Sequence, residues 1–270
     1  MWKWEAEGQP KAVIAMLHGA YEHHRWYAWL IEKLRMSGFH IVMGDLPGHG
    51  EEYKFSRLHN EDFDDYHLHT KHLLKVAEEY NLPIFLVGNA MGGTLAVHAV
   101  QKYKTEIAGL VLVSPWIQLK KTPSKLTSAL KSIGKSPSNV KITQDLTYHD
   151  FSRNTELHSE MQSEEVAFNT TITMKWYQEL QAQMKILRLP EVKLKKMPVA
   201  VFTGGQDVLS DVAATKAWFL HHAKELSHFE YREFSGAYQN LFLEVEREEA
   251  FQHTVDFIDN CLRSLGYIIK

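Results

Sequence analysis

Residues 88 to 93 read Gly-Asn-Ala-Met-Gly-Gly, a pattern typical of a nucleophile elbow with Ala90 at its centre. An elbow is a sharp turn from a strand into a helix, and its flanking glycines let these two elements approach closely. The apolar run before residue 88 and the helical spacing after residue 93 fit that context. Because alanine carries neither a hydroxyl nor a thiol, the sequence predicts an elbow without a nucleophile.

His18-Gly19-Ala20 directly follows the first apolar run of the chain. In this arrangement the loop after that run and the residue after the elbow centre each give a backbone N–H to an oxyanion hole, so we expect Ala20 and Met91 to be the donors. Both are backbone groups and do not depend on the side chain at position 90. A plain turn is the alternative interpretation of residues 18 to 20.

Two further positions belong to the same acyl-transfer chemistry. Asp207 follows an apolar run where a triad acid should emerge, with Asp211 as the alternative acid and a solvent-facing turn as the structural alternative. The base position is Gln239, whose neutral amide cannot take a hydroxyl proton near pH 7. His228 precedes the last strand and His253 lies within the last helix, so we expect neither to replace the base.

Two other features have structural interpretations. Asp45-Leu-Pro-Gly-His-Gly50 is a cluster of turn residues after an apolar run, and we expect no catalytic role for His49. Cys261 is the only cysteine, which excludes an internal disulfide, and on a helical pattern it is expected to be a small buried side chain.

Apolar strands alternate with helical patterns along the chain and must position these residues. This alternation predicts an α/β fold with a doubly wound, mostly parallel sheet. The expected strands are Ala12 to Leu17, Phe39 to Met43, Ile84 to Val87, Ile107 to Val113, Pro198 to Thr203 and His228 to Phe234. The expected helices are Trp26 to Met36, Glu61 to Tyr80, Ala90 to Tyr103, Ile172 to Leu187, Val212 to Ala223 and Leu241 to Leu265.

The alternation stops after Ser114 and resumes after Pro190, so we predict a core of residues 1–114 and 191–270 with a cap inserted at 115–190. Six lysines from Lys120 to Lys141 have no acidic residue among them and form either a solvated surface or a peripheral contact with an anionic membrane. Later cap residues either line an acyl tunnel or simply pack, and these are Met161, Met174, Trp176, Tyr177 and Met184.

The composition limits the classes of partner and location. A net charge of −3 gives no support for a nucleic-acid partner. Because the amino terminus lacks an apolar signal segment and no run approaches 18 apolar residues, the expected location is the cytoplasm. We expect no cofactor and no metal ion, and the expected ligand is a small lipid or ester. The oligomeric state stays open.

Together these motifs are similar to those of the monoacylglycerol lipase and lysophospholipase group of α/β-hydrolases, including the YtpA-like bacterial phospholipases. The similar segments are His18 to His23 with Tyr27, Asp45 to Gly50, Gly88 to Gly93, Gly204 to Asp207, and Gly236 to Gln239 followed by Glu244 and Arg247. The resemblance implies an α/β-hydrolase fold and hydrolysis of lipid carboxylic esters by a Ser-His-Asp triad. It implies these positions: nucleophile Ala90, acid Asp207, base Gln239, and oxyanion donors Ala20 and Met91. Asn89 stands where the family usually has a histidine.

Loss of the nucleophile or the base lowers the turnover of a serine triad about a millionfold, so we expect triad hydrolysis to be undetectable. Three interpretations stay open. The chain is a natural non-catalytic relative that binds a lipid or other small ligand under its cap, a lipid-ester hydrolase silenced deliberately, or a hydrolase with an unrecognised nucleophile. The joint change at Asn89, Ala90 and Gln239 favours the first, and no residue offers itself for the third.

Overall fold

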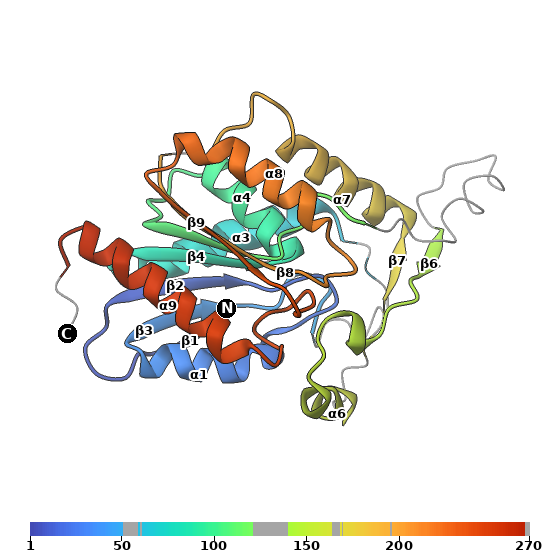
Figure 1. The fold of residues 1–270 in the computed structure, drawn as a ribbon, viewed down its shortest axis with the longest axis horizontal. Helices are drawn as coiled ribbons and strands as arrows, with labels where there is room; N and C mark the ends of the chain where they lie inside the picture. The colour runs from blue at the N-terminus through green and yellow to red at the C-terminus, as the bar shows by residue number, and fades with distance from the viewer. Residues whose placement is uncertain are drawn as a thin grey trace.

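The computed structural model describes residues 1–50, 59, 61–120, 140–163, 168, 170–194 and 196–267. Seven strands of these residues form one sheet in the order β1-β3-β2-β4-β5-β8-β9 (Figure 1). Their bounds are β1 Trp2–Trp4, β2 Ala12–Leu17, β3 Phe39–Met43, β4 Ile84–Asn89, β5 Gly109–Val113, β8 Pro198–Gly204 and β9 His228–Phe234. All neighbouring pairs are parallel except β1 with β3, so the predicted α/β fold with a mostly parallel sheet is confirmed.

Helices cover both faces of the sheet (Figure 1). One face carries α3 (Phe63–Glu78), α4 (Met91–Lys102) and α8 (Val212–His222), and the other carries α1 (Ala28–Met36) and α9 (Arg247–Ser264). Short 3-10 turns, η1 (His24–Tyr27) and η4 (Ala223–Glu225), adjoin α1 and α8. Each face has its own apolar core, since Leu95 and Phe219 pack on the first and Leu30 and Phe257 on the second. β2, β4 and β5 are buried along their whole length, because helices cover both faces of the sheet. Such strands are typically rich in apolar residues, as these are.

Further elements lie between β5 and β8, outside the seven-stranded sheet (Figure 1). They are β6 (Lys141–Thr143), η3 (Tyr148–Asp150), α6 (Thr155–Ser163), β7 (Thr171–Thr173) and α7 (Met174–Leu187). β6 and β7 pair antiparallel in a separate two-stranded sheet. His59 joins this sheet to the core, because its N–H donates to the Thr171 carbonyl at 3.0 Å and its carbonyl accepts from the Thr173 N–H at 3.0 Å. The lysines at 121, 125, 131 and 135 lie outside the described residues.

Two element predictions need correction. The last helix begins at Arg247 rather than Leu241, because residues 241–246 form turns. The Glu244 carboxylate accepts the backbone N–H groups of Tyr238 at 2.7 Å and Val245 at 3.0 Å, which holds the chain in a non-helical path. The helix expected over Ile172 to Leu187 begins at Met174, because Ile172 and Thr173 belong to β7. The antiparallel edge strand β1 and the short strands β6 and β7 were not predicted. No helix among the described residues is long and apolar enough to cross a membrane.

Candidate active site

Ala90 lies at the turn between β4 and α4 with φ 49° and ψ −115°. This is a sparsely populated backbone conformation for a residue with a Cβ atom. The Ala90 N–H donates to the Val113 carbonyl at 2.9 Å, and the Ala90 carbonyl accepts from the Gly93 N–H at 3.0 Å and the Trp116 N–H at 3.1 Å. The strained turn expected of an elbow is therefore present, and β5 and the segment after it hold its tip.

The glycines around Ala90 are required by close backbone approach. A Cβ atom at Gly88 would lie 2.5 Å from the Gly92 carbonyl oxygen, and one at Gly92 would overlap the Leu17 carbonyl oxygen. A Cβ atom at Gly93 would lie 2.8 Å from Cβ of Pro115. Helix α4 can therefore pack this tightly against β2 and β4 only with glycine at these positions.

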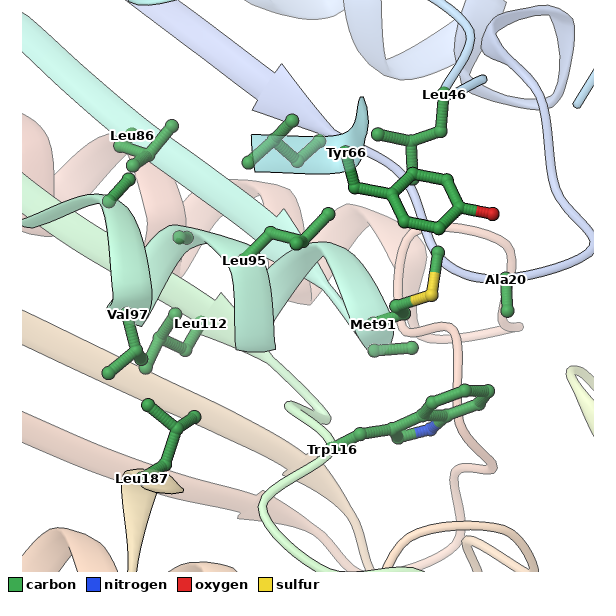
Figure 2. Close-up of a cluster of buried hydrophobic side chains, with 14 of the residues drawn as sticks. Ala20, Leu46, Tyr66, Leu86, Met91, Leu95, Val97, Leu112, Trp116 and Leu187 are labelled. Carbon is green, nitrogen blue, oxygen red and sulfur yellow. The ribbon is translucent and has the colours of Figure 1, made fainter. Parts of the chain in front are cut away.

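The loop of Ala20 is fixed by the buried His18 ring. His18 Nδ1 donates to the Gly19 carbonyl at 2.7 Å, and Nε2 accepts from the Leu46 N–H at 2.8 Å, an arrangement that needs the neutral ring. Burial lowers the pKa of His18 to about 3. Ala20 and Met91 lie around the amino-terminal end of α4 (Figure 2). No backbone carbonyl of the described residues accepts the N–H of either one.

Asp207 is completely buried, so the solvent-facing alternative is wrong. Its Oδ1 accepts from the Leu209 N–H at 2.8 Å and the Ser210 N–H at 3.0 Å, and its Oδ2 accepts from the Ser210 hydroxyl. Burial raises the pKa of Asp207 to about 6, although these hydrogen bonds oppose the rise. Asp211 caps α8 instead, accepting the Ala214 N–H at 2.9 Å.

Gln239 is also completely buried, and neither atom of its amide has a hydrogen-bond partner among the described residues. Its loop contacts both the acid loop and the region predicted as the cap. The Gln206 N–H donates to the Ala237 carbonyl at 2.9 Å, and the Asn240 N–H donates to the Phe151 carbonyl at 2.9 Å.

The two histidines considered as substitute bases lie elsewhere. His228 begins β9 and stacks on Phe257 with 5.8 Å between ring centroids. His253 lies on α9 near Glu230 and Glu249, at 4.0 and 3.6 Å. Neither belongs to the loop that carries position 239. Cys261 is a buried residue of α9, as predicted.

The proposed ligand-contacting residues Met174, Trp176 and Tyr177 are all buried on α7. Trp176 Nε1 donates to Tyr66 Oη at 2.9 Å, and its ring lies 6.3 Å from that of Tyr21, the residue after Ala20. The start of α7 is thus close to the loop that follows β2. Met161 and Met184 are buried as well, but they belong to different apolar cores.

Sequence reasoning gave Glu22 no role, yet its side chain is only 1% exposed and bonds to Gly19 and Asn89, on either side of the site. A carboxylate is rarely buried without a specific set of donors. The sequence carried a signal, because Glu22 and its partner Tyr27 both belong to the similar segments named above.

The chain matches the family model described as Serine aminopeptidase, S33 (Hydrolase_4) over residues 8–246. It is 34% identical to phospholipase YtpA of Bacillus subtilis over 264 residues, which cover 96% of this chain and 99% of that protein. It is also 32% identical to the human monoglyceride lipase over 119 residues, 42% of this chain and 38% of that protein.

Among solved structures, a soluble variant of monoglyceride lipase from Saccharomyces cerevisiae in complex with a substrate analog superposes with a TM-score of 0.83. The alignment covers 96% of this chain and 90% of that chain at 18% identity, so it supports the fold alone. The family match and the near full-length similarity to YtpA show the family as well as the fold. The chain therefore belongs to the α/β-hydrolase family of the monoglyceride lipases and YtpA-type phospholipases, a family of lipid-ester hydrolases.

Proposed function

We propose that this chain binds a lipid ester or another small ligand beneath a cap formed by residues 115–190 and does not hydrolyse it through a serine triad. The observation that carries the proposal is Ala90 at the tip of a strained elbow. A methyl group there cannot attack a carbonyl carbon. The buried amide of Gln239, which has no hydrogen-bond partner in the part of the chain that the structure describes, supports the same conclusion, because it cannot serve as a general base.

The remaining groups suit binding rather than turnover. In the proposal, the N–H groups of Ala20 and Met91 hold the ligand carbonyl oxygen, since both lie at the elbow and neither has a backbone acceptor among the described residues. Met174, Trp176 and Tyr177 contact the apolar part of the ligand. Asp207 keeps the acid position, with its oxygens engaged inside its own loop.

The second candidate is a lipid-ester hydrolase whose site was silenced by substitution. The retained strain at Ala90 and the buried carboxylate of Asp207 favour it, because these features serve a triad. Reading the natural gene at codons 90 and 239 separates a designed change from natural drift.

The direct test compares the chain with an Ala90→Ser, Gln239→His double variant on p-nitrophenyl butyrate and on monoacylglycerols. We expect no triad turnover from the chain itself, while calorimetry detects lipid binding. Activity of the double variant supports the silenced-enzyme candidate, and an inert but folded, lipid-binding variant rejects it. Normal turnover by the unmodified chain contradicts the assignment of both positions, and absence of lipid binding contradicts the binding proposal.

A further inference from the structure

Glu22 is a buried carboxylate with hydrogen bonds to four separate parts of the chain. Its Oε2 accepts from the Gly19 N–H at 2.7 Å and from Tyr27 Oη at 2.5 Å. Its Oε1 accepts from Asn89 Nδ2 at 2.9 Å and from Asn240 Nδ2 at 3.0 Å. Both oxygens of the buried Glu22 carboxyl group therefore face N–H or O–H donors.

Three of these partners adjoin the proposed site positions along the chain. Gly19 precedes Ala20, Asn89 precedes Ala90, and Asn240 follows Gln239. The three segments come from the loop after β2, the end of β4 and the loop after β9, and they are far apart in sequence. One side chain therefore joins the oxyanion loop, the elbow and the base loop.

The fourth partner, Tyr27, connects Glu22 to Asn240. Tyr27 Oη donates to Glu22 and also accepts from Asn240 Nδ2 at 3.1 Å, which closes a ring of three side chains. Packing is equally close, because a Cβ atom at Gly19 would lie 3.0 Å from both Ala90 Cβ and Glu22 Oε1. Burial raises the pKa of Glu22, and the four donors oppose that rise.

We propose that Glu22 is the positioning residue of this site, fixing the oxyanion loop, the elbow and the base loop relative to one another. The inference rests on the proposed site positions. A binding or catalytic constellation must be held within about 0.5 Å, and this requires supporting hydrogen bonds behind the groups that touch the ligand. Because the donors of all three loops converge on one carboxyl group, displacing any one of these loops breaks at least one of its hydrogen bonds.

Hydrogen exchange of the unmodified chain and its variants tests the proposal without any need for activity. Glu22→Met removes every acceptor at similar volume, and amide exchange should rise at least tenfold in segments 17–21, 88–92 and 237–241 together. Asn240→Leu removes the bonds of the base loop to Glu22 and Tyr27, together with the bond from the Phe242 N–H to Asn240 Oδ1, and should affect only segment 237–241. Asp259→Asn, whose carboxylate bonds Lys11 at the other end of β2, is the control and should change none of the three.

Two outcomes overturn the proposal. In one, Glu22→Met raises exchange only in segment 17–21 and at residue 22, while segments 88–92 and 237–241 keep their protection. In the other, Asn240→Leu leaves segment 237–241 unchanged, and this variant decides the matter even if Glu22→Met does not fold.

A kinetic split provides the second readout. In the Ala90→Ser, Gln239→His background, adding Glu22→Gln should lower kcat at least tenfold and leave KM within threefold, because an amide offers one acceptor oxygen to donors that now use two. A lower melting temperature with unchanged kcat contradicts positioning. If the double variant itself is inert, the restored triad has failed, and the exchange pattern alone decides the role of Glu22.

Discussion

At position 90 the backbone keeps a conformation that an alanine has no chemical reason to adopt. A non-glycine residue with φ 49° and ψ −115° costs on the order of 1–3 kcal/mol. Bonds to Val113 and Trp116, together with close packing of α4 against β2, impose the turn from outside. The elbow is therefore a property of the surrounding structure, and it persists whether or not residue 90 can react.

Asp207 gives a prediction at the same scale. Its pKa is about 6 in the folded chain against 3.8 in the unfolded chain, so the folded state binds the proton more tightly. Its contribution to stability is therefore fully present below pH 3.8 and is lost as pH rises through 6. From pH 4.5 to 7.5 the chain should lose about 2 kcal/mol of unfolding free energy relative to Asp207→Asn.

Urea titrations of both proteins at the two pH values measure this difference. Because the same comparison is made at each pH, the titration of all other groups cancels. A difference between the two proteins that does not vary with pH contradicts the assigned cause.

The junction of β2, β4 and α4 gives a prediction at the scale of elements. Gly92→Ala places a Cβ atom against the Leu17 carbonyl, a backbone atom that cannot move aside. We expect a loss of about 3 kcal/mol or more, at the upper end of overpacking effects. Gly8→Ala is the control, since Gly8 has φ +73° with open space around it and only about 1–2 kcal/mol of backbone strain is expected. Equal losses in thermal unfolding contradict the steric account.

The start of α9 provides a matched pair of variants. Glu244 is completely buried and accepts from Tyr238, Val245 and Arg153, whereas the Glu246 carboxylate is partly exposed and bonds to Arg153 alone among the described residues. Glu244→Ala should cost about 3 kcal/mol because it removes the acceptor of three backbone N–H groups, those of Arg153, Tyr238 and Val245, while the Arg153 guanidinium keeps its pair with Glu246. Glu246→Ala should cost about 1 kcal/mol or less. Chemical denaturation that ranks the two variants the other way rejects this account.

The elements differ in how far the sequence could predict them. β2, β3 and β9 have the predicted bounds because each is a run of strand-forming residues bordered by turn residues. The predicted start of α9 was wrong because Leu241, Phe242 and Leu243 fit a helical pattern. Their turns are held by the Glu244 carboxylate, which accepts the N–H groups of Tyr238 and Val245 and that of Arg153, distant in sequence. β1 is too short to give a periodic signal.

The site residues likewise differ in how far the sequence could predict them. Positions 90, 207 and 239 follow from local spacing after strands, so sequence alone could propose them. The Glu22 network could not be predicted, because its partners Asn89 and Asn240 are 67 and 218 residues away. The sheet order places the end of β4 beside the loop after β2 and so brings Asn89 to Glu22, whereas Asn240 reaches Glu22 through the loop after β9, the strand at the far edge of the sheet.

Over the whole molecule, buried histidines make stability depend on pH. Burial lowers the pKa of His18 to about 3 and that of His49 to about 4, against 6.5 unfolded. The stability from these neutral rings is fully present above pH 6.5 and is lost as pH falls toward 4. Between pH 7.5 and 5.0 each ring should account for on the order of 2 kcal/mol.

Denaturant midpoints measured at both pH values check this prediction. A His49→Gln variant serves as the comparison and should show a shallower fall, because it removes one of the titrating groups. A midpoint that does not fall between pH 7.5 and 5.0 contradicts the buried neutral state of these histidines.

The account depends on the absence of an activated nucleophile at the elbow, and covalent labelling tests this most directly. A fluorophosphonate reacts with activated serines independently of acyl length or headgroup. After incubation, the intact mass of this chain should stay unchanged, while the Ala90→Ser, Gln239→His variant should gain one adduct at residue 90. A stoichiometric adduct on the unmodified chain, at any residue, contradicts the central claim.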